Sequence, residues 1–224
     1  LSKTKGRAEP VDKKAHKPSP LRSARATLAH PYARRVAILM VLTTLTFTLV
    51  DYLFKSQVAR DVAHEDLGSF FARVYFVLNI VSLFVQLVVT RWVIRVGGPT
   101  RALAVLPGLL AVGGLGVFLG GGLAAGVLLK GADAGLRHSL HRTASELLYV
   151  PMGTQLRKAS KTFIDIVAHR GGQAISSVLI LGVAAAGVDI DVLGAAIVVL
   201  AAAAVVTALE LRRQLCAPCI DTAK

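Results

Sequence analysis

Long apolar stretches separated by short polar segments run along most of this chain. Six stretches can be marked, at Val36–Phe54, Phe70–Thr90, Ala102–Gly121, Leu123–Val150, Thr162–Gly187 and Val188–Leu211. Each comes close to or exceeds the roughly 20 residues that a helix needs to cross about 30 Å of hydrocarbon. Since only helices and closed barrels satisfy their backbones in lipid, and these stretches do not alternate with a period of two, we predict helices. The pattern therefore predicts an all-α integral membrane protein, with a six-transmembrane-helix bundle over residues 36–211.

Composition supports this assignment. Hydrophobic residues make up 54% of the 224 residues, and the mean hydropathy is +0.61. This apolar share is above that of typical soluble domains. The segment before Val36 contains no apolar core of its own, so no secretory signal is predicted there, and the first span would itself direct the chain to the membrane.

Lysine and arginine are concentrated in alternate connections between the stretches. The tail before the first stretch is rich in them, the connection after it is mainly acidic, and the next is basic again, with Arg91, Arg95 and Arg101. The alternation continues to Arg212 and Arg213 after the sixth stretch. Because short basic loops stay on the cytoplasmic side, we predict a multi-pass protein with both termini in the cytoplasm.

The first 35 residues form a separate region. They contain ten basic and two acidic residues, and so carry eight of the thirteen net positive charges, together with four prolines and few apolar residues. This composition predicts a basic disordered cytoplasmic linker over residues 1–35. The positive-inside rule and attraction to anionic lipid headgroups explain its charge, so no nucleic-acid partner is predicted. Residues 212–224 are predicted to be a cytoplasmic C-terminal tail.

The two cysteines, Cys216 and Cys219, form a single Cys-x-x-Cys in that tail. Without a second pair or a βαβ context, this motif is a weak signal for redox or metal chemistry. His138 and His141 also lack a third and a fourth ligand at a useful spacing. The sequence therefore predicts no metal and no cofactor.

Charged residues inside the apolar stretches are the strongest indication of function. A charge at membrane depth costs roughly several kcal/mol unless it faces the bundle interior or a water-filled path. In the fourth stretch, Lys130, Arg137 and His141 fall within a narrow arc of one helix, and Asp133 lies one turn before Arg137. Further along the chain come the i,i+4 pair Arg142 and Glu146, then Lys161, Asp165, His169 and Arg170.

Two other stretches carry polar residues on one helical face, at a 4-3-4 spacing. They are Thr44, Thr48, Asp51 and Lys55 in the first stretch, and Tyr75, Asn79, Ser82 and Gln86 in the second. Asp51 and Lys55 can form an i,i+4 ion pair. Such faces are typical of a wet path or of helix–helix hydrogen bonds, and the spacing leaves both open. In the third stretch, the GxxxG pair Gly116 and Gly120 predicts close helix packing.

Cations outnumber anions in the fourth and fifth stretches, which favours an anionic solute, with carboxylates holding the basic groups between binding events. The predicted substrate-binding residues are Arg137, His141, Arg142, Lys161, Arg170 and Asn79. The predicted charge-pair or gating residues are Asp51, Lys55, Asp133, Glu146, Asp165 and His169. The alternative is that these residues form structural inter-helix pairs and bind nothing.

Several motifs resemble one carrier family. The segment Leu136–Gly172, with ELLYVP at Glu146–Pro151, LRKASKTFID at Leu156–Asp165 and HRGG at His169–Gly172, resembles the C-terminal half of bacterial and plastid ATP/ADP translocases. DYLFK at Asp51–Lys55 looks like the first helix of that half. The resemblance implies one half of a major-facilitator-type carrier that exchanges ATP for ADP by alternating access, in a bacterial inner membrane.

The same resemblance implies roles for individual residues. Phosphate contacts would come from Arg137, Arg142, Lys161 and Arg170, with Glu146 and Asp165 as their counter-ions. The loop Arg91–Ala102, RWVIRVGGPTRA, looks like the basic turn between the second and third helices of the major facilitator superfamily, without its usual acidic residue.

A carrier of this type needs two six-helix halves to enclose its path. Because the chain has six predicted spans and begins with Leu1, we expect an N-terminal half in the same polypeptide, or a second copy, as its partner. The other expected partners are the lipid bilayer and a small anionic solute, which the resemblance identifies as ATP or ADP. The competing hypothesis is a non-transporting membrane scaffold or sensor. An enzyme is not predicted, because the sequence has no paired aspartates and no HExxH motif.

Overall fold

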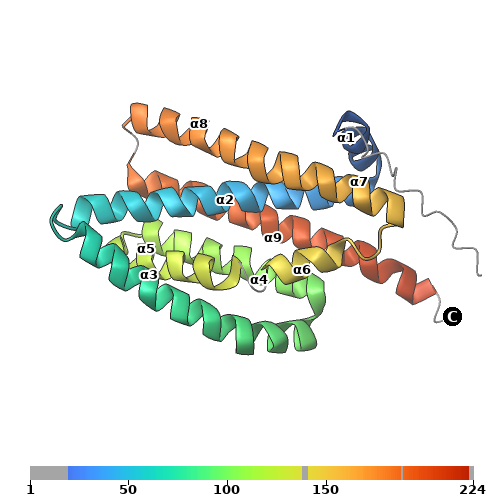
Figure 1. Cartoon of the computed structure of the whole chain (residues 1–224), viewed down its shortest axis with the longest axis horizontal. Coiled ribbons are helices and arrows are strands. Elements are labelled where there is room, and N and C mark those ends of the chain that lie inside the picture. The colour runs from blue at the N-terminus through green and yellow to red at the C-terminus, as the bar shows by residue number, and fades with distance from the viewer. Residues whose placement is uncertain (1–19, 138–140, 188, 222–224) are drawn as a thin grey trace, which may run out of the picture.

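The computed structural model describes residues 20–137, 141–187 and 189–221, and within these ranges it is helical, with no β-strand. The elements are α1 (Pro20–Ala29), α2 (Pro31–Asp61), α3 (Leu67–Phe84), the π-helical segment η1 (Val85–Val89), α4 (Thr90–Phe118), α5 (Gly122–Leu136), α6 (Arg142–Leu148), α7 (Thr154–Ile164), the π-helical segment η3 (Asp165–Gly171), α8 (Gly172–Ala185) and α9 (Ile190–Asp221). The long helices form one elongated bundle, and α1 lies across one end of it (Figure 1).

Four of the described helices are long and apolar enough to cross a membrane. They cover Pro31–Asp61, Leu67–Val88, Thr154–Ala185 and Val192–Leu211, and so contain most of the first, second, fifth and sixth predicted stretches. A further apolar helical segment, Ala104–Phe118 in α4, is shorter. The chain is therefore an all-helical protein whose helices suit a membrane, which confirms the coarse fold prediction.

Two predicted boundaries differ in the structure. The sequence predicts one span over Leu123–Val150, whereas α5 ends at Leu136 and α6 is only seven residues long, with residues 138–140 outside the described part. The predicted loop at Arg91–Ala102 has helical backbone within α4, and the ribbon doubles back there (Figure 1). Glycine and proline at residues 97–99 permit this sharp bend without ending the helix.

Within the predicted linker, residues 20–29 form α1 and residues 31–35 begin α2. Pro31 occupies the first turn of α2, where its fixed φ and missing N–H carry no penalty. The hydroxyl of Thr27 in α1 donates to Ser160 of α7 at 3.2 Å, and both side chains are fully buried. Contacts with α7 therefore order a segment whose composition alone predicts disorder.

The central helix of the bundle is α2, which packs against α5, α8 and α9. Several of its apolar side chains, among them Leu39, Val50 and Phe54, are fully buried. The most extensive contact in the described structure joins α4 to α9. A Cβ added to Gly194 of α9 would lie 3.0 Å from the backbone oxygen of Gly114 in α4, so the backbones meet where neither residue has a side chain.

The predicted close packing at Gly116 and Gly120 occurs elsewhere in α4. A Cβ on Gly116 would meet only Ala125, at 3.8 Å, and a Cβ on Gly120 would meet nothing within 4 Å. Gly120 instead has a φ of +83° and makes the turn into α5, a conformation that suits glycine. The crowded glycines of α4 are Gly113, which faces Leu129 of α5, and Gly114, which faces α9, three and two residues before Gly116.

Helix pairing follows a repeating pattern. The first three helical rods are α2, α3 with η1, and α4; the last three are α5 with α6, α7 with η3 and α8, and α9. The third rod of each set packs against the first rod of the other set: α9 packs against α2, and α4 packs against α5 and α6. The second rods also pack against the first rod of the other set, since α8 packs against α2 and α3 packs against α5. Contacts of α2 with α5 and of α4 with α9 join equivalent rods. Exchanging the two sets of three rods therefore preserves the main contacts.

Candidate functional site

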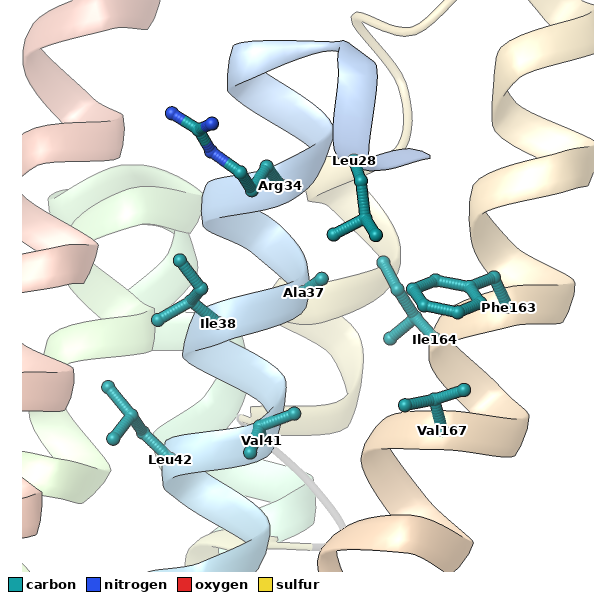
Figure 2. Close-up of a pocket in the computed structure, with 9 residues that line it drawn as sticks. All are labelled: Leu28, Arg34, Ala37, Ile38, Val41, Leu42, Phe163, Ile164 and Val167. Atoms are coloured by element: carbon teal, nitrogen blue, oxygen red, sulfur yellow. The ribbon is translucent and has the colours of Figure 1, made fainter. Parts of the chain in front are cut away.

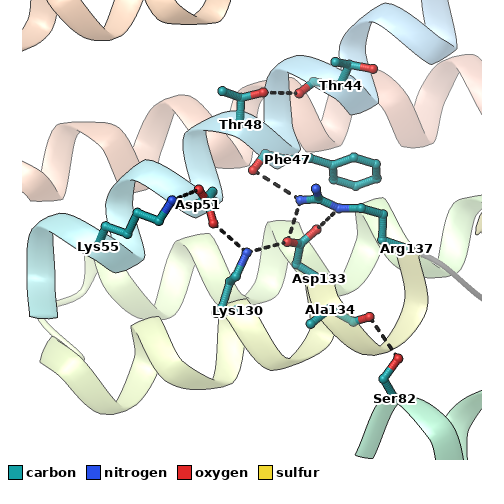
Figure 3. A network of polar contacts seen from close by, with 10 residues as sticks. All are labelled: Thr44, Phe47, Thr48, Asp51, Lys55, Ser82, Lys130, Asp133, Ala134 and Arg137. Carbon is teal, nitrogen blue, oxygen red and sulfur yellow. Dashed lines mark hydrogen bonds and ion pairs between the residues drawn. The ribbon is translucent and has the colours of Figure 1, made fainter. Parts of the chain in front are cut away.

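A chain of ion pairs connects α2 to α5 (Figure 3). Asp51 lies on α2, where its Oδ2 accepts a bond from Lys55 Nζ at 2.6 Å, one turn further along the helix. Its other oxygen, Oδ1, accepts a bond from Lys130 Nζ of α5 at 2.8 Å. The predicted i,i+4 pair is therefore present, and Asp51 also bridges two helices.

Asp133 continues the chain on α5. Its Oδ2 accepts a bond from Lys130 Nζ at 3.3 Å. The guanidinium of Arg137, one turn later, donates Nε to Oδ1 at 2.8 Å and Nη2 to Oδ2 at 2.5 Å. This two-point geometry is the strong form of an arginine–carboxylate pair. Helical spacing on α5 thus places one carboxylate between two cations.

Phe47 of α2 provides an aromatic wall beside this pair. The guanidinium carbon of Arg137 lies 4.3 Å from the centroid of the Phe47 ring, and Arg137 Nη2 also donates to the Phe47 carbonyl oxygen at 3.4 Å. The ring of His141 meets the same phenyl ring edge-on, with centroids 5.3 Å apart. His141 is buried, and its Nδ1 has no hydrogen-bond partner among the described residues.

Burial makes this network expensive to disrupt. Asp133 is 1% exposed and Lys130 is 7% exposed. Removing one partner of a buried ion pair typically costs about 3–5 kcal/mol, because the other charge is left uncompensated. The described network contains three cations, Lys55, Lys130 and Arg137, and two carboxylates. The network therefore carries one excess positive charge, between α2 and α5.

A second ion pair joins α6 to α7, which carry other predicted site residues. Lys161 Nζ of α7 donates to both carboxylate oxygens of Glu146 in α6, each at 2.8 Å. Both side chains are substantially exposed, with 42% and 50% of their surface accessible. The sequence spacing predicts that Glu146 pairs with Arg142, but in the structure it binds Lys161, fifteen residues away.

Several predicted site residues lie outside these two clusters. Asn79, Arg142, His169 and Arg170 are exposed. Asp165 begins the π-helical segment η3, and its side chain lies outside the described part of the structure, as do those of Cys216 and Cys219. Asn79 lies one turn after Tyr75, whose ring stacks on Phe71 with centroids 6.1 Å apart. Those aromatic rings lie toward α2, where Phe71 contacts Phe54.

Sequence reasoning assigned no role to two members of the central network. Lys130 belongs to the same arc as Arg137, and its i,i+3 spacing to Asp133 was a visible signal that it shares this carboxylate. Phe47 lies one turn before Asp51 on the same face of α2, but an aromatic residue in an apolar stretch gives no sign of the cation it contacts. The bond from Lys130 to Asp51 and the contact of Phe47 with Arg137 both depend on the packing of α2 against α5.

The arrangement can hold an anion but offers little for metal chemistry. No group of three or more His, Cys, Asp or Glu side chains in the described residues could hold a metal ion. The cations instead follow one another along the network, and each forms an ion pair with a carboxylate whose place an anion could take. No protein-family model, no curated protein and no solved structure matches this chain.

Proposed function

We propose that this chain is one half of a secondary membrane transporter for a small anionic solute, working by alternating access. The observation that carries the proposal is the cation-rich network of Asp51, Lys55, Lys130, Asp133 and Arg137 among apolar helices. Ionisable side chains at membrane depth are rare and mark ion or substrate pathways by default. The excess positive charge sets the sign of the solute.

The repeated helix pairing supports a major-facilitator-type architecture. Each half of such carriers contains two three-helix repeats of inverted topology. In this chain the first three rods and the last three make equivalent contacts, and Gly114 and Gly194 meet where the third rod of one set crosses the third rod of the other. This internal symmetry is the fold-level support for the proposal, together with the motifs between Leu136 and Gly172.

The geometry supplies a mechanism for a switch. When no solute is bound, Asp51 and Asp133 form ion pairs with the cations, and these pairs hold α2 against α5. An arriving anion competes with Asp133 for Arg137 and with Asp51 for Lys55, because both cations are partly exposed, at 29% and 56%. Release of the carboxylates would loosen the link between α2 and α5. A ligand shifts a conformational equilibrium only through such differential contacts.

ATP/ADP exchange is the specific form of this proposal. It rests on the resemblance of residues 136–172 and of DYLFK at Asp51–Lys55 to nucleotide translocases. A nucleotide would place its phosphates on Arg137, and on Lys161 after displacing Glu146. The partner that closes the path is an N-terminal six-helix half or a second copy.

Uptake tests the proposal directly. The complete reading frame that contains this chain is expressed in bacteria, membrane insertion is confirmed, and uptake of radiolabelled ATP is measured with and without excess unlabelled ADP. We expect uptake that ADP suppresses. If insertion is good and ATP does not enter, nucleotide exchange is wrong, and the same assay with other radiolabelled anions then tests the broader carrier proposal.

A non-transporting scaffold or sensor is the second candidate. The observation in its favour is that every carboxylate of the central network already has two cationic contacts, as expected of a purely structural lock. In this case, neutralising Arg137 would weaken assembly and no solute would show dependence on the network. Comparing stability with uptake in the same variant separates the two functions.

A further inference from the structure

A half-open apolar groove lies at the end of the bundle where α1 crosses α2 (Figure 2). Its volume is about 260 Å³, and apolar side chains of α1, α2, α7 and η3 line it, among them Leu28, Val41 and Phe163. This is below the roughly 300–1,000 Å³ of pockets that hold a drug-sized ligand. An open, purely apolar trough of this size suits a section of hydrocarbon chain.

One charged residue lines the groove. Arg34 contributes to its wall near the end where Leu28 lies, and its guanidinium extends beyond the apolar side chains (Figure 2). Arg34 is exposed, and no ion pair of Arg34 occurs among the described side chains; Glu210 forms an ion pair with the neighbouring Arg35, at 3.8 Å. The groove therefore combines an apolar floor with an unpaired cation at one end.

The elements around this end of the groove add further positive charge. Arg25 of α1 and Arg157 and Lys158 of α7 are all exposed. The bond from Thr27 to Ser160 holds α1 against α7, so these basic side chains stand on two packed helices rather than on a free tail. Basic pockets between transmembrane helices are typical binding sites for anionic lipid headgroups.

We propose that this groove binds one anionic phospholipid, with an acyl chain along α2 and η3 and the headgroup phosphate on Arg34. The proposal does not depend on what the chain transports. An arginine favours a phosphate because its planar guanidinium offers two parallel donors. A zwitterionic lipid would fill the groove equally well, but its own ammonium group would offset the attraction, so the structure predicts selectivity for a headgroup with net negative charge.

Native mass spectrometry of the purified full chain tests this. The protein is extracted with detergent from vesicles that contain both phosphatidylglycerol and phosphatidylcholine. The detergent is then removed in the mass spectrometer, and the lipids that stay bound to the protein are identified and counted. We expect one phosphatidylglycerol to be retained in preference to phosphatidylcholine. Arg34→Gln should lower this retention about tenfold, the effect of losing one charge-assisted hydrogen bond. Val41→Trp, which fills the groove, should lower retention of both lipids.

Two matched variants serve as controls. Arg60→Gln removes a cation that is 58% exposed at the opposite end of α2 from Arg34, and Leu181→Trp adds bulk to α8 at a side chain that is 69% exposed. Both should retain phosphatidylglycerol as the unmodified chain does. Equal retention of the two lipids, an Arg34→Gln variant that behaves like the unmodified chain, or equal losses in Arg34→Gln and Arg60→Gln would each overturn the proposal. Arg34 is exposed, so its replacement leaves the packing intact.

Discussion

Asp133 is the residue on which the central network depends. It is 1% exposed and bonds to both Lys130 and Arg137, so it is the buried carboxylate that compensates two cations. Glu146, by contrast, is half exposed and makes a single ion pair. Exposed ion pairs contribute only about 0–1 kcal/mol, whereas a broken buried pair costs about 3–5 kcal/mol.

Asp133→Asn should therefore destabilise the protein by about 3–5 kcal/mol, whereas Glu146→Gln should cost less than about 1 kcal/mol. The measurement is the free energy of unfolding in detergent or bicelles, with both variants made in the same background. The substitution keeps the shape of the side chain and removes its charge. Similar stabilities of the two variants would show that the network is not compensated through Asp133.

Arg137→Ala tests the carrier proposal at the same place. We expect membrane insertion to be unchanged and uptake of the transported anion to fall by about tenfold to a hundredfold, as expected for the loss of one or two charge-assisted hydrogen bonds. Arg213→Gln, in the exposed end of α9, is the control and should transport normally. Normal uptake by a correctly inserted Arg137→Ala variant would contradict the assignment of Arg137 to the solute path.

Which of these contacts the sequence could predict follows from their spacing. The Asp51–Lys55 and Asp133–Arg137 pairs lie one helical turn apart, and a helix alone brings such residues together. The bond from Lys130 to Asp51 joins residues 79 positions apart, and its existence depends on how α2 packs against α5. Helical periodicity carries no information about that packing.

The close approach of α4 and α9 depends on a different feature, namely glycines that have no side chain. Sequence motifs located small residues in α4, but the structure uses Gly114, where α9 supplies Gly194, rather than the GxxxG pair. The partner glycine lies 80 residues later in a stretch of alanine and valine that has no motif. The apolar stretches thus predicted the four helices that are long enough to cross a membrane, whereas the contact that sets the α4–α9 distance required the structure.

Gly194→Leu should separate α4 from α9. A Cβ at this position would already lie 3.0 Å from the Gly114 oxygen and 3.0 Å from the Phe118 nitrogen, which are backbone atoms that cannot rotate away. Overpacking of this kind typically costs about 1–3 kcal/mol. Gly182→Leu in α8 is the control, because nothing lies within 4 Å of its added Cβ. Thermal unfolding of both variants in detergent measures the difference, and equal midpoints would contradict close backbone packing at Gly194.

The bundle as a whole leaves one polar face open. Thr48, Asp51 and Lys55 follow one side of α2, and Asn79 lies on the side of α3 that continues from Tyr75 toward α2. In a lone six-helix bundle this face would meet lipid, where each unpaired polar group costs free energy. A water-filled path closed by a second half removes that cost. The same reasoning predicts that the opposite side of α3 meets lipid.

Thiol accessibility distinguishes these two sides. Val77 is 55% exposed, and Asn79, two residues later, is also exposed, but the two point about 200° apart around the helix, at roughly 100° per residue. Only a thiol in contact with water ionises, and the thiolate is the form that reacts with a maleimide. In membrane vesicles that carry the complete protein with Cys216 and Cys219 replaced by serine, a hydrophilic maleimide should therefore label Asn79→Cys readily and Val77→Cys slowly.

Addition of the transported anion should slow the labelling of Asn79→Cys and leave the labelling of Val77→Cys unchanged. Equal labelling at both positions would place the two sides of α3 in the same environment, and the polar face would then line no path.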